Sequence, residues 1–308
     1  MARWTNLLLI GSLLLPARTQ VVIGVPRNPG VIRVDVDLVN VLCSVRDHGG
    51  TWAQGLTRDD FEVREDGKPR KVTHFAADSD SPMTVALLVD VSGSVADILE
   101  IERVAARRFL DEVLRPGDQA LIGGFSSTIP IWQDLTGSVP DLHAGVERVS
   151  ATSDIVTEGV RPRGGTLLYD AVDLVASRKL ARLRGRKTLV LITDGVDNGS
   201  KVSIDHAVKS AQQADAVLFA IHYVPRSYGG SEGKRPLDKL SEPTGGRTFS
   251  VSAKMPLERA FAEIADEMRH QYSLGFTPEK RDGEFHKLEV KVKRAGMKLT
   301  TRNGYYAR

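Results

Sequence analysis

Apolar residues follow two different patterns along the chain, and the two patterns predict two kinds of sheet. Between Ile32 and Leu42, apolar and polar side chains alternate, which is typical of a strand with one buried face. Residues 84–89 and 187–193 instead form continuous, mostly apolar runs. Strands that are covered on both faces, as in a parallel sheet, have this second pattern. We therefore expect an antiparallel region near the N-terminus and a parallel sheet further along.

Segments with helical spacing separate the apolar runs. In residues 98–114 the predicted buried stripe consists of Ile101, Val104, Ala105, Phe109 and Val113. The further predicted helices are residues 141–149, 167–178, 204–214, 237–241 and 256–270, and the further predicted strands are residues 119–125, 129–133, 216–221 and 247–251. Repeated strand–helix units place helices on both faces of one sheet. Residues 82–270 are thus predicted to form a doubly wound, mostly parallel α/β domain.

Strand patterns without helices flank this domain on both sides. Near the N-terminus, a strand from Phe61 is predicted to enter an Asp66-Gly67 turn and to return over residues 71–75. Near the C-terminus, the predicted strands are residues 272–276, 286–293 and 299–305. We expect the segments 32–80 and 271–308 to build one smaller β-rich module, since chain ends often lie close together. Two separate flanking pieces are the alternative.

The N-terminus has the pattern of a targeting segment. Arg3 precedes a short apolar run, Leu7–Leu15, and Pro16-Ala17 follows it. A membrane-spanning helix needs about 20 apolar residues, so this run fits a signal peptide better. We predict a signal peptide at residues 1–19, a linker at 20–31, and export to the cell envelope, the periplasm or the exterior. An uncleaved anchor is the alternative, and no later segment is long and apolar enough to cross a membrane.

Composition limits the kinds of partner and the sources of stability. The chain has 308 residues, of which 41% are apolar, which is enough for one medium domain and a smaller module. Its net charge is only +3 and no basic stripe is present, so nucleic acid is not the expected partner. The single cysteine, Cys43, excludes an internal disulfide and is predicted to be a buried apolar residue.

Oxygen-bearing side chains follow two of the buried runs and begin one of the helices. Asp90, Ser92 and Ser94 come directly after the first buried strand, where Gly93 allows a tight bend. Thr166 follows a glycine pair at the start of a predicted helix, and Asp194 follows the strand at residues 187–193. Ligands of open α/β sheets bind beyond the carboxyl ends of the strands. These side chains are therefore candidates for one shared site.

The candidate ligands are two carboxylates and three hydroxyls, without histidine or cysteine. Such hard oxygens suit Mg²⁺, Mn²⁺ or Ca²⁺ and do not suit zinc or copper. Mg²⁺ binds about six oxygens, so five side chains leave one position open. Because two carboxylates only just neutralise the cation, an anionic oxygen from a protein or peptide partner is the expected sixth ligand.

The three motifs together resemble a known site. The sequence D-x-S-x-S after an apolar strand, a threonine in a later glycine-containing loop, and T-D-G after another strand are similar to the metal-ion-dependent adhesion site (MIDAS) of von Willebrand factor A-type (VWA) domains. The resemblance implies a VWA, Rossmann-like fold for residues 82–270. It also implies that Ser92, Ser94 and Thr166 are near-direct ligands, and that Asp90 and Asp194 bind the metal directly or through water.

The flanking segments resemble those of secreted bacterial VWFA-related proteins. The similarity lies in residues 56–63, Leu-Thr-Arg-Asp-Asp-Phe-Glu-Val, and in residues 304–307, Gly-Tyr-Tyr-Ala. It bears on the architecture, since little biochemistry is assigned to that subfamily.

Three functions fit these observations to different degrees. The first is a cation-dependent protein-binding module, for which Arg161 and Arg163 are candidates to contact an acidic partner. The second is an enzyme, but G-x-S-x-G, G-x-G-x-x-G and the P-loop motif are missing and no general base is evident. The third is a structural envelope protein with a purely stabilising metal site. Ser92 and Ser94 as plain helix caps remain the simplest alternative to metal binding.

Overall fold

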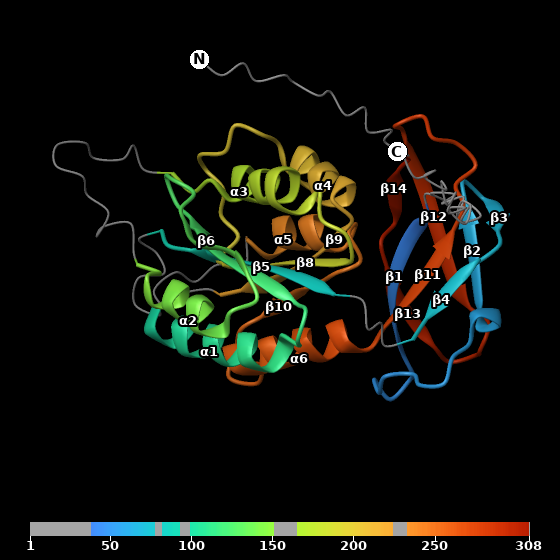
Figure 1. Ribbon diagram of the computed structural model, residues 1–308, viewed down its shortest axis with the longest axis horizontal. Helices are drawn as coiled ribbons and strands as arrows, with labels where there is room; N and C mark the ends of the chain where they lie inside the picture. Colours follow the sequence, from blue (N-terminus) through green and yellow to red (C-terminus); the bar gives the residue numbers. More distant parts are fainter. Residues whose placement is uncertain (1–37, 78–81, 93–98, 151–164, 224–232, 308) are drawn as a thin grey trace, which may run out of the picture. The chain divides into compact units, whose positions relative to one another are not determined.

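The two continuous apolar runs are neighbours at the centre of a six-stranded sheet. They form β5 (Met83–Asp90) and β8 (Arg186–Thr193), which pair in parallel and are buried along their whole length. The sheet order is β10-β9-β8-β5-β6-β7 (Figure 1). The other strands are β6 (Gln119–Phe125), β7 (Ile131–Thr136), β9 (Ala216–His222) and β10 (Thr248–Ser250). Only β7, at one edge, is antiparallel to its neighbour. This is a computed structural model, and it describes residues 38–77, 82–92, 99–150, 165–223 and 233–307.

Helices cover both faces of this sheet. The helices on one face are α1 (Leu99–Val113), α2 (Val139–Glu147) and α6 (Leu257–Arg269), and those on the other are α3 (Leu168–Leu174), the π-helical segment η4 (Val175–Leu180), α4 (Ile204–Gln213) and α5 (Lys234–Ser241) (Figure 1). Alternate residues of β5 face the two helical layers, Leu87 one layer and Leu88 the other. The predicted doubly wound, mostly parallel α/β fold is confirmed.

The stripe predicted for α1 is partly wrong. Ala105, Phe109 and Val113 are buried as expected, but the side chain of Val104 is 41% exposed. Glu102 occupies a buried position on the same helix instead. Among the described helices, none combines the length and the apolar character that crossing a membrane requires.

Strands from before and after the α/β region build two antiparallel sheets. One has the order β13-β1-β11-β4 and the other β14-β12-β2-β3. The earlier strands are β1 (Val39–Arg46), β2 (Phe61–Glu65), β3 (Lys68–Arg70) and β4 (His74–Ala76), with a 3₁₀ turn, η1 (Arg58–Asp60), before β2. The later strands are β11 (Gln271–Phe276), β12 (Phe285–Val292), β13 (Lys298–Thr301) and β14 (Gly304–Tyr306). The expected β-rich module of N- and C-terminal strands is present; we call it the β module.

The predicted return strand at residues 71–75 is wrong. Asp66 and Gly67 both have positive φ angles, 48° and 79°, so they form a two-residue hairpin turn. The strand therefore returns at once as β3, with Lys68 opposite Glu65. β4 begins at His74, three residues after the predicted start of the return strand, and it pairs with β11 in the other sheet.

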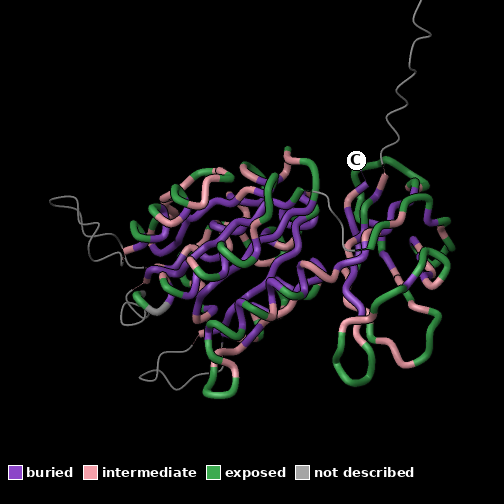
Figure 2. The backbone as a smooth tube through the Cα atoms, turned by 60° about the horizontal axis from the view of Figure 1, so that its bottom comes forward, coloured by how far each residue is buried: buried purple, intermediate pink, exposed green. Residues whose placement is uncertain are grey.

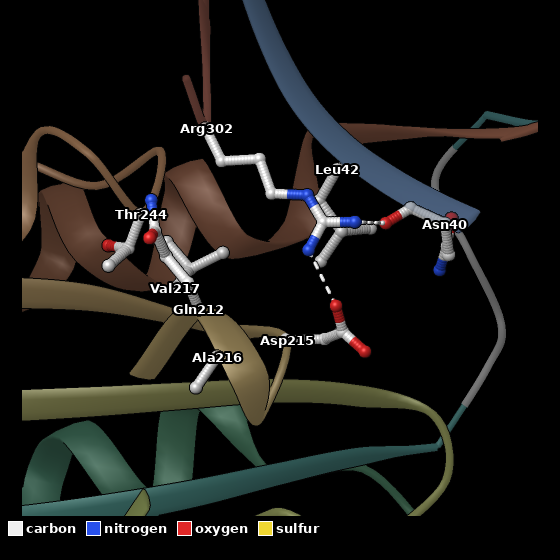
Figure 3. A pocket seen from close by; sticks show the side chains of 8 residues that line it. All are labelled: Asn40, Leu42, Gln212, Asp215, Ala216, Val217, Thr244 and Arg302. Atoms are coloured by element: carbon white, nitrogen blue, oxygen red, sulfur yellow. Dashed lines mark hydrogen bonds and ion pairs between the residues drawn. The ribbon is translucent and has the colours of Figure 1, made fainter. Parts of the chain in front are cut away.

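The predicted last strand, residues 299–305, is divided between the two sheets. β13 pairs with β1, whereas β14 pairs with β12. Arg302 lies at the division, where its guanidinium donates to Asp215 at 2.5 Å and to the carbonyl of Asn40 at 2.7 Å (Figure 3). It borders a small pocket, lined by Asn40, Leu42, Gln212, Asp215, Ala216, Val217, Thr244 and Arg302. These contacts hold the backbone between the sheets, which strand alternation alone does not predict.

The β module has its own core between its two sheets. Rings of Phe61, Phe75 and Tyr272 contact one another there, with centroids 5.4–5.9 Å apart. Cys43 is buried in the same core, and burial raises the pKa of its thiol, so it is the apolar core residue that its pattern predicts. Figure 2 shows that buried backbone runs through the strands and that exposed backbone is concentrated in the connections.

One buried carboxylate joins the two ends of the β module. Glu65 is 1% exposed, and its oxygens accept hydrogen bonds from Arg70 at 2.5 Å, from the hydroxyl of Tyr305 and from the backbone N–H of Glu279 at 3.3 Å. Charged and hydroxyl donors compensate the desolvation of this carboxylate. Tyr305 belongs to the Gly-Tyr-Tyr-Ala segment, so its hydroxyl gives that segment a structural role.

Several predicted features lie outside the described residues. They are the signal peptide (1–19), the linker (20–31), the start of the predicted first strand (32–37), Ser94, Arg161 and Arg163.

Candidate functional site

Asp90 ends β5 and is the most buried of the candidate ligands. The residue is 1% exposed, since strands lie on both sides of it: Asp90 is opposite Phe125 of β6, and the preceding Val89 is opposite Ile192 of β8. One carboxylate oxygen accepts the backbone N–H of Ser92 at 2.9 Å, and the other accepts the hydroxyl of Thr193 at 2.7 Å. These bonds fix the orientation of the Asp90 carboxylate at the carboxyl edge of the sheet.

Asp194 follows the neighbouring strand, β8, at the same edge. Its carboxylate accepts the backbone N–H of Val196 at 3.0 Å. The next residue, Gly195, has φ = 81°, and a Cβ atom built on it would lie 2.3 Å from the carbonyl oxygen of Gly233. Only glycine fits this conformation and this contact. The T-D-G sequence therefore brings the backbone beside Asp194 against a second glycine.

Thr166 is held beside the loop that begins at Asp194. The side chain of Asn198 accepts the backbone N–H of Thr166 at 2.5 Å, and the backbone N–H of Asn198 donates to the carbonyl of Thr166 at 3.3 Å. The next residue, Leu167, donates to the carbonyl of Ser126 after β6 at 2.9 Å. Thr166 is thereby connected to the loops that follow β6 and β8.

The same loop after β8 caps α3. Leu167, the residue before the helix, makes no side-chain capping bond. Instead, the backbone N–H of Tyr169 donates to the carboxylate of Asp197 at 3.2 Å and to the hydroxyl of Ser200 at 3.1 Å, and Asp170 N–H also donates to Ser200. These acceptors satisfy N–H groups that lack partners inside the helix. Asp197 and Asn198 thus position the Thr166 segment.

Two carboxylates lie near each other at this edge, and their charges interact. Burial, the largest cause, and the negative charge of Asp194 together raise the pKa of Asp90 to about 6, against the opposing effect of the hydrogen bonds from Thr193 and Ser92. A raised pKa means that the charged form of Asp90 is destabilised here. A cation bound between the carboxylates would reverse that effect.

A third buried carboxyl lies on α1, and the sequence analysis missed it. Glu102 is 2% exposed, and burial together with the charge of Asp90 raises its pKa to about 8. Within the described part of the chain, its Oε2 atom has no hydrogen-bond partner. Glu102 precedes Ala105, Ala106 and Phe109 at helical spacing, so a charged residue in a buried stripe was the available signal.

Two further hydroxyls at the end of β6 were also missed. The Oγ atoms of Ser126 and Ser127 are buried and have no hydrogen-bond partner among the described residues. A buried polar atom without a partner costs free energy unless a ligand or water satisfies it. A serine pair after a buried strand was the signal, and it resembles the Ser92 position on the neighbouring strand.

These donors fit a hard cation. The structure brings Asp90 and Ser92 together and ties Thr166 to the loop of Asp194, while Ser94 is not described. In the described ranges, no three His, Cys, Asp or Glu side chains group as a metal site. Hydroxyl oxygens would therefore have to complete the ligand set. Mg²⁺, Mn²⁺ and Ca²⁺ prefer such oxygen ligands, whereas softer metals prefer nitrogen or sulfur.

Comparison with solved structures finds the same fold. The BatB protein from Bacteroides thetaiotaomicron is 16% identical, with a TM-score of 0.49 over 60% of this chain and 97% of that one. Proximal thread matrix protein 1 from the mussel byssus, in a structure with a zinc-occupied MIDAS motif, is 17% identical, with a TM-score of 0.51 over 67% of this chain and 50% of that one. No match was found among curated proteins.

A family comparison covers the α/β region itself. The sequence profile described as "von Willebrand factor type A domain" matches residues 84–263, more than half of the chain. The match begins in β5, whose last residue is Asp90, includes Thr166 and Asp194, and ends in α6. The chain therefore belongs to the von Willebrand factor type A domain family.

Proposed function

We propose that this protein is a divalent-cation-dependent protein-binding module of adhesion type. In the proposal, Asp90, Ser92, Ser94, Thr166 and Asp194 hold Mg²⁺, Mn²⁺ or Ca²⁺. The bound cation would supply a positive centre for a carboxylate of a protein or peptide partner. Hydrogen bonds from Ser92 and Thr193 orient the Asp90 carboxylate, and Asn198 positions the Thr166 segment. No residue is assigned a catalytic role.

The observation that carries the proposal is the charge arrangement at the edge of the sheet. Asp90 is buried, its pKa is raised, and Asp194 adds to that shift. Burying the Asp90 carboxylate beside the half-buried carboxylate of Asp194 is costly unless a positive charge compensates them. Among the described residues, the hydroxyls of Ser126 and Ser127, which follow the neighbouring strand β6, have no hydrogen-bond partner; they are further oxygens that a hydrated cation would bind.

A binding role is favoured over catalysis by the residue types present. The described part of the edge offers carboxylates and hydroxyls, and nothing there combines a nucleophile with a general base that activates it. Two carboxylates only neutralise the charge of a divalent cation. An acidic residue of a partner is therefore still a suitable further ligand. The solved structures are similar to this chain in fold alone, so they do not identify its partner.

Cation binding is tested by titrating the full chain with each metal. We expect Mg²⁺, Mn²⁺ or Ca²⁺ to raise the Tm of the parent protein and the Asp194→Ala variant to lose that shift while it stays folded. Stabilisation by a ligand follows its concentration relative to Kd, so the Tm shift reports affinity. Zinc is included in the titration, because the mussel protein holds zinc at its MIDAS motif.

The matched control is Asp59→Ala, which removes a carboxylate whose side chain is 84% exposed on the β module. It should keep the full metal-dependent Tm shift. Equal shifts for Asp194→Ala and the parent protein would remove the basis of the proposed site.

Partner binding is tested separately by affinity capture from an envelope extract. Capture that EDTA abolishes and Mg²⁺ restores supports the adhesion-type role. Capture that is unaffected by EDTA, together with a normal metal-dependent Tm shift, would instead assign the metal a purely stabilising role. The proposed location at the cell envelope or exterior rests on the apolar run Leu7–Leu15, and detection of the chain in the cytoplasmic fraction alone would contradict it.

A further inference from the structure

One carboxyl group is buried behind the proposed metal site without a partner for one of its oxygens. Glu102 is 2% exposed, and its Oε2 atom has no hydrogen-bond partner among the described residues. Glutamate is almost never fully buried unless it is paired. A buried polar atom without a partner also lowers the stability of a fold. Packing alone therefore does not explain a glutamate at this position.

The helical pattern places this carboxyl in the apolar face of α1. Ala105, Ala106, Phe109 and Val113 follow Glu102 at helical spacing, and all four are buried. A leucine at position 102 would continue this face without the cost of burying a polar group. The carboxyl thus occupies a position at which the fold itself favours an apolar side chain.

The surroundings of Glu102 favour its neutral form. A small cavity beside it is lined by Glu102 and Arg103 and by six apolar residues, Leu87, Val89, Ala106, Ile122, Val146 and Val149. Burial, the largest cause, and the negative charge of Asp90 together raise the pKa of Glu102 to about 8. Glu102 therefore carries a proton at neutral pH as long as nothing compensates the charge of Asp90.

Asp90 is the charged group that acts on Glu102 from the sheet. β5 has no other charged residue, and β6 has none. The charged side chains of α1 and α2, and the one buried charged residue of α6, are exposed or have partners of their own. The partners are Arg103 with Glu100 and the carbonyl of Val149, Arg107 with Glu147, Asp111 with His143, Arg148 with Gln133, and Glu267 with Arg247. The protonation of Glu102 therefore depends on the charge at Asp90.

The position of Glu102 within α1 allows the opposite charge state as well. The helix begins at Leu99, so Glu102 lies in its first turn. The partial positive charge of a helix N-terminus stabilises an anion there. A cation at Asp90 would also replace repulsion of the Glu102 carboxylate by attraction. Both effects favour ionised Glu102 once a cation is bound.

We propose that Glu102 is a further residue of the metal site, which acts through Asp90 by exchanging a proton for the cation. Without a cation, Glu102 holds its proton. When a divalent cation binds at Asp90, the O–H bond of the Glu102 carboxyl breaks, the proton passes to water, and the carboxylate adds its negative charge to the site. Because the cation drives this release, Glu102 can have the role only if the proposed metal site exists.

In this role Glu102 acts by its charge and not as a ligand. Over the ranges that the structure describes, it does not group with two other His, Cys, Asp or Glu side chains as a metal site. A cation that must displace a proton binds more weakly as the pH falls. The site should therefore hold its cation, and a partner that depends on the cation, less tightly in acidic surroundings.

Calorimetric titration of the full chain with Mg²⁺ at pH 7 and at pH 9 tests this role. A carboxyl with a pKa of about 8 is about nine-tenths protonated at pH 7 and about one-tenth protonated at pH 9. The affinity of the parent protein should therefore rise about tenfold between the two pH values. At pH 7, buffers of different ionisation enthalpy should report release of about one proton per cation. Asp90, with a pKa of about 6, is ionised at both pH values and contributes little.

Glu102→Gln keeps the shape of the side chain and removes the proton exchange. Its Mg²⁺ affinity should change by less than about twofold between pH 7 and pH 9, with almost no proton release. The folded state raises the pKa of Glu102, so the residue costs stability increasingly as pH rises above its ordinary value of 4.5. The cation-free variant should thus gain more Tm over the parent at about pH 8 than at about pH 4.

The matched control is Glu100→Gln, which removes a carboxylate from the same helix whose side chain is 73% exposed. This variant should keep the tenfold rise in affinity and the proton release of the parent protein. A loss of both in Glu100→Gln would assign the effect to the general charge of α1 and would overturn the role of Glu102.

Other outcomes separate this role from the metal site itself. If Glu102→Gln bound Mg²⁺ with the same pH dependence as the parent protein, Glu102 would have no role, and the metal site would stand. If the parent bound no divalent cation at either pH, both proposals would fall. Carboxyl NMR of the cation-free chain adds a measurement that needs no metal: one glutamate should titrate near pH 8 and be missing in Glu102→Gln. Titration of that carboxyl near pH 4.5 would overturn the role of Glu102 alone.

Discussion

Asn198 and Thr166 are joined by two hydrogen bonds, from Thr166 N–H to the Asn198 side chain at 2.5 Å and from Asn198 N–H to the Thr166 carbonyl at 3.3 Å. Together they fix the loop after β8, which begins at Asp194, against the segment that carries Thr166. The relative position of these two candidate ligands therefore depends on a residue that is not itself a candidate ligand.

The first prediction concerns this connection. Asn198→Ala removes the acceptor for a buried N–H, which costs about 1–3 kcal/mol, so we expect cation affinity to fall by about tenfold or more in a calorimetric titration. Asn198→Asp keeps an acceptor oxygen and should restore binding. If both variants bound the cation as tightly as the parent protein does, Asn198 would have no positioning role.

Gly195 tests how closely the backbone beside Asp194 must pack. Gly195→Ala places a Cβ against Gly233 in a left-handed conformation and should lower both Tm and cation affinity, by at least about 1–2 kcal/mol in unfolding free energy. Gly50 has the same φ of 81° but no atom within 4 Å of an added Cβ. Gly50→Ala should therefore show only the conformational cost and normal cation binding. Identical losses for the two variants would argue against the Gly233 contact.

The buried carboxylate of Glu65 predicts a stability effect far from the metal site. Tyr305→Phe removes a hydroxyl that donates to Glu65 but keeps the ring contact with Phe276. Leaving the carboxylate less satisfied should lower the unfolding free energy by about 1–3 kcal/mol in urea denaturation. Tyr306→Phe, at a half-buried neighbour, should change it little. Cation affinity should be unaffected by either variant.

His286 gives the β module a pH-dependent contribution to stability. Its two ring nitrogens lie 3.0 Å from Asp282 and 2.7 Å from Asp66. Hydrogen bonding to Asp282, opposed by burial and supported by Asp66, holds the pKa of His286 above its usual 6.5. In return, His286 lowers the pKa values of Asp66 and Asp282 below 3.8.

The sign follows from these directions. The stabilisation from His286 is fully present below about pH 6.5 and is lost as pH rises through its raised pKa; that from the aspartates is lost as pH falls below about 4. His286→Gln should therefore lower Tm more at about pH 5.5 than at about pH 8.5. The aspartates are partly exposed, so the effect should be small and should shrink in high salt. An equal loss at both pH values would contradict the prediction.

The parallel sheet was predictable because its strands have no exposed face. β5 is apolar over Val85–Val89 and β8 over Leu189–Ile192, and the positions directly after these strands are then fixed at one edge. That is why Asp90 and Asp194, which are far apart in sequence, were both selected. The local pattern marks Glu102, Ser126 and Ser127 as polar residues at buried positions. That these side chains have atoms without a hydrogen-bond partner among the described residues depends on the neighbouring elements, which the pattern does not show.

The β module was harder to predict because alternation does not identify the sheet to which a strand belongs. The pattern of residues 299–305 continues through Arg302, although that residue bonds to Asn40 and Asp215 and the chain changes sheets there. Likewise, because the turn contains only Asp66 and Gly67, the return strand begins at Lys68 and not at residue 71, and β4 pairs in the other sheet. The tertiary contacts of Arg302 decide the first outcome, and the local backbone conformation of Asp66 and Gly67 decides the second.

The order of the strands has a consequence for synthesis. Among the described strands, β1 pairs with β11 and β13, and β4 pairs with β11, so neither has these neighbours until the chain has been made through β11. As translation proceeds, these two strands wait with open edges while the intervening parallel sheet can already assemble. Long-range pairing of this kind is slow and leaves strands exposed to aggregation. A chain that ends before β11 would thus keep β1 and β4 without their native neighbour and leave their edges open to pairing with other molecules.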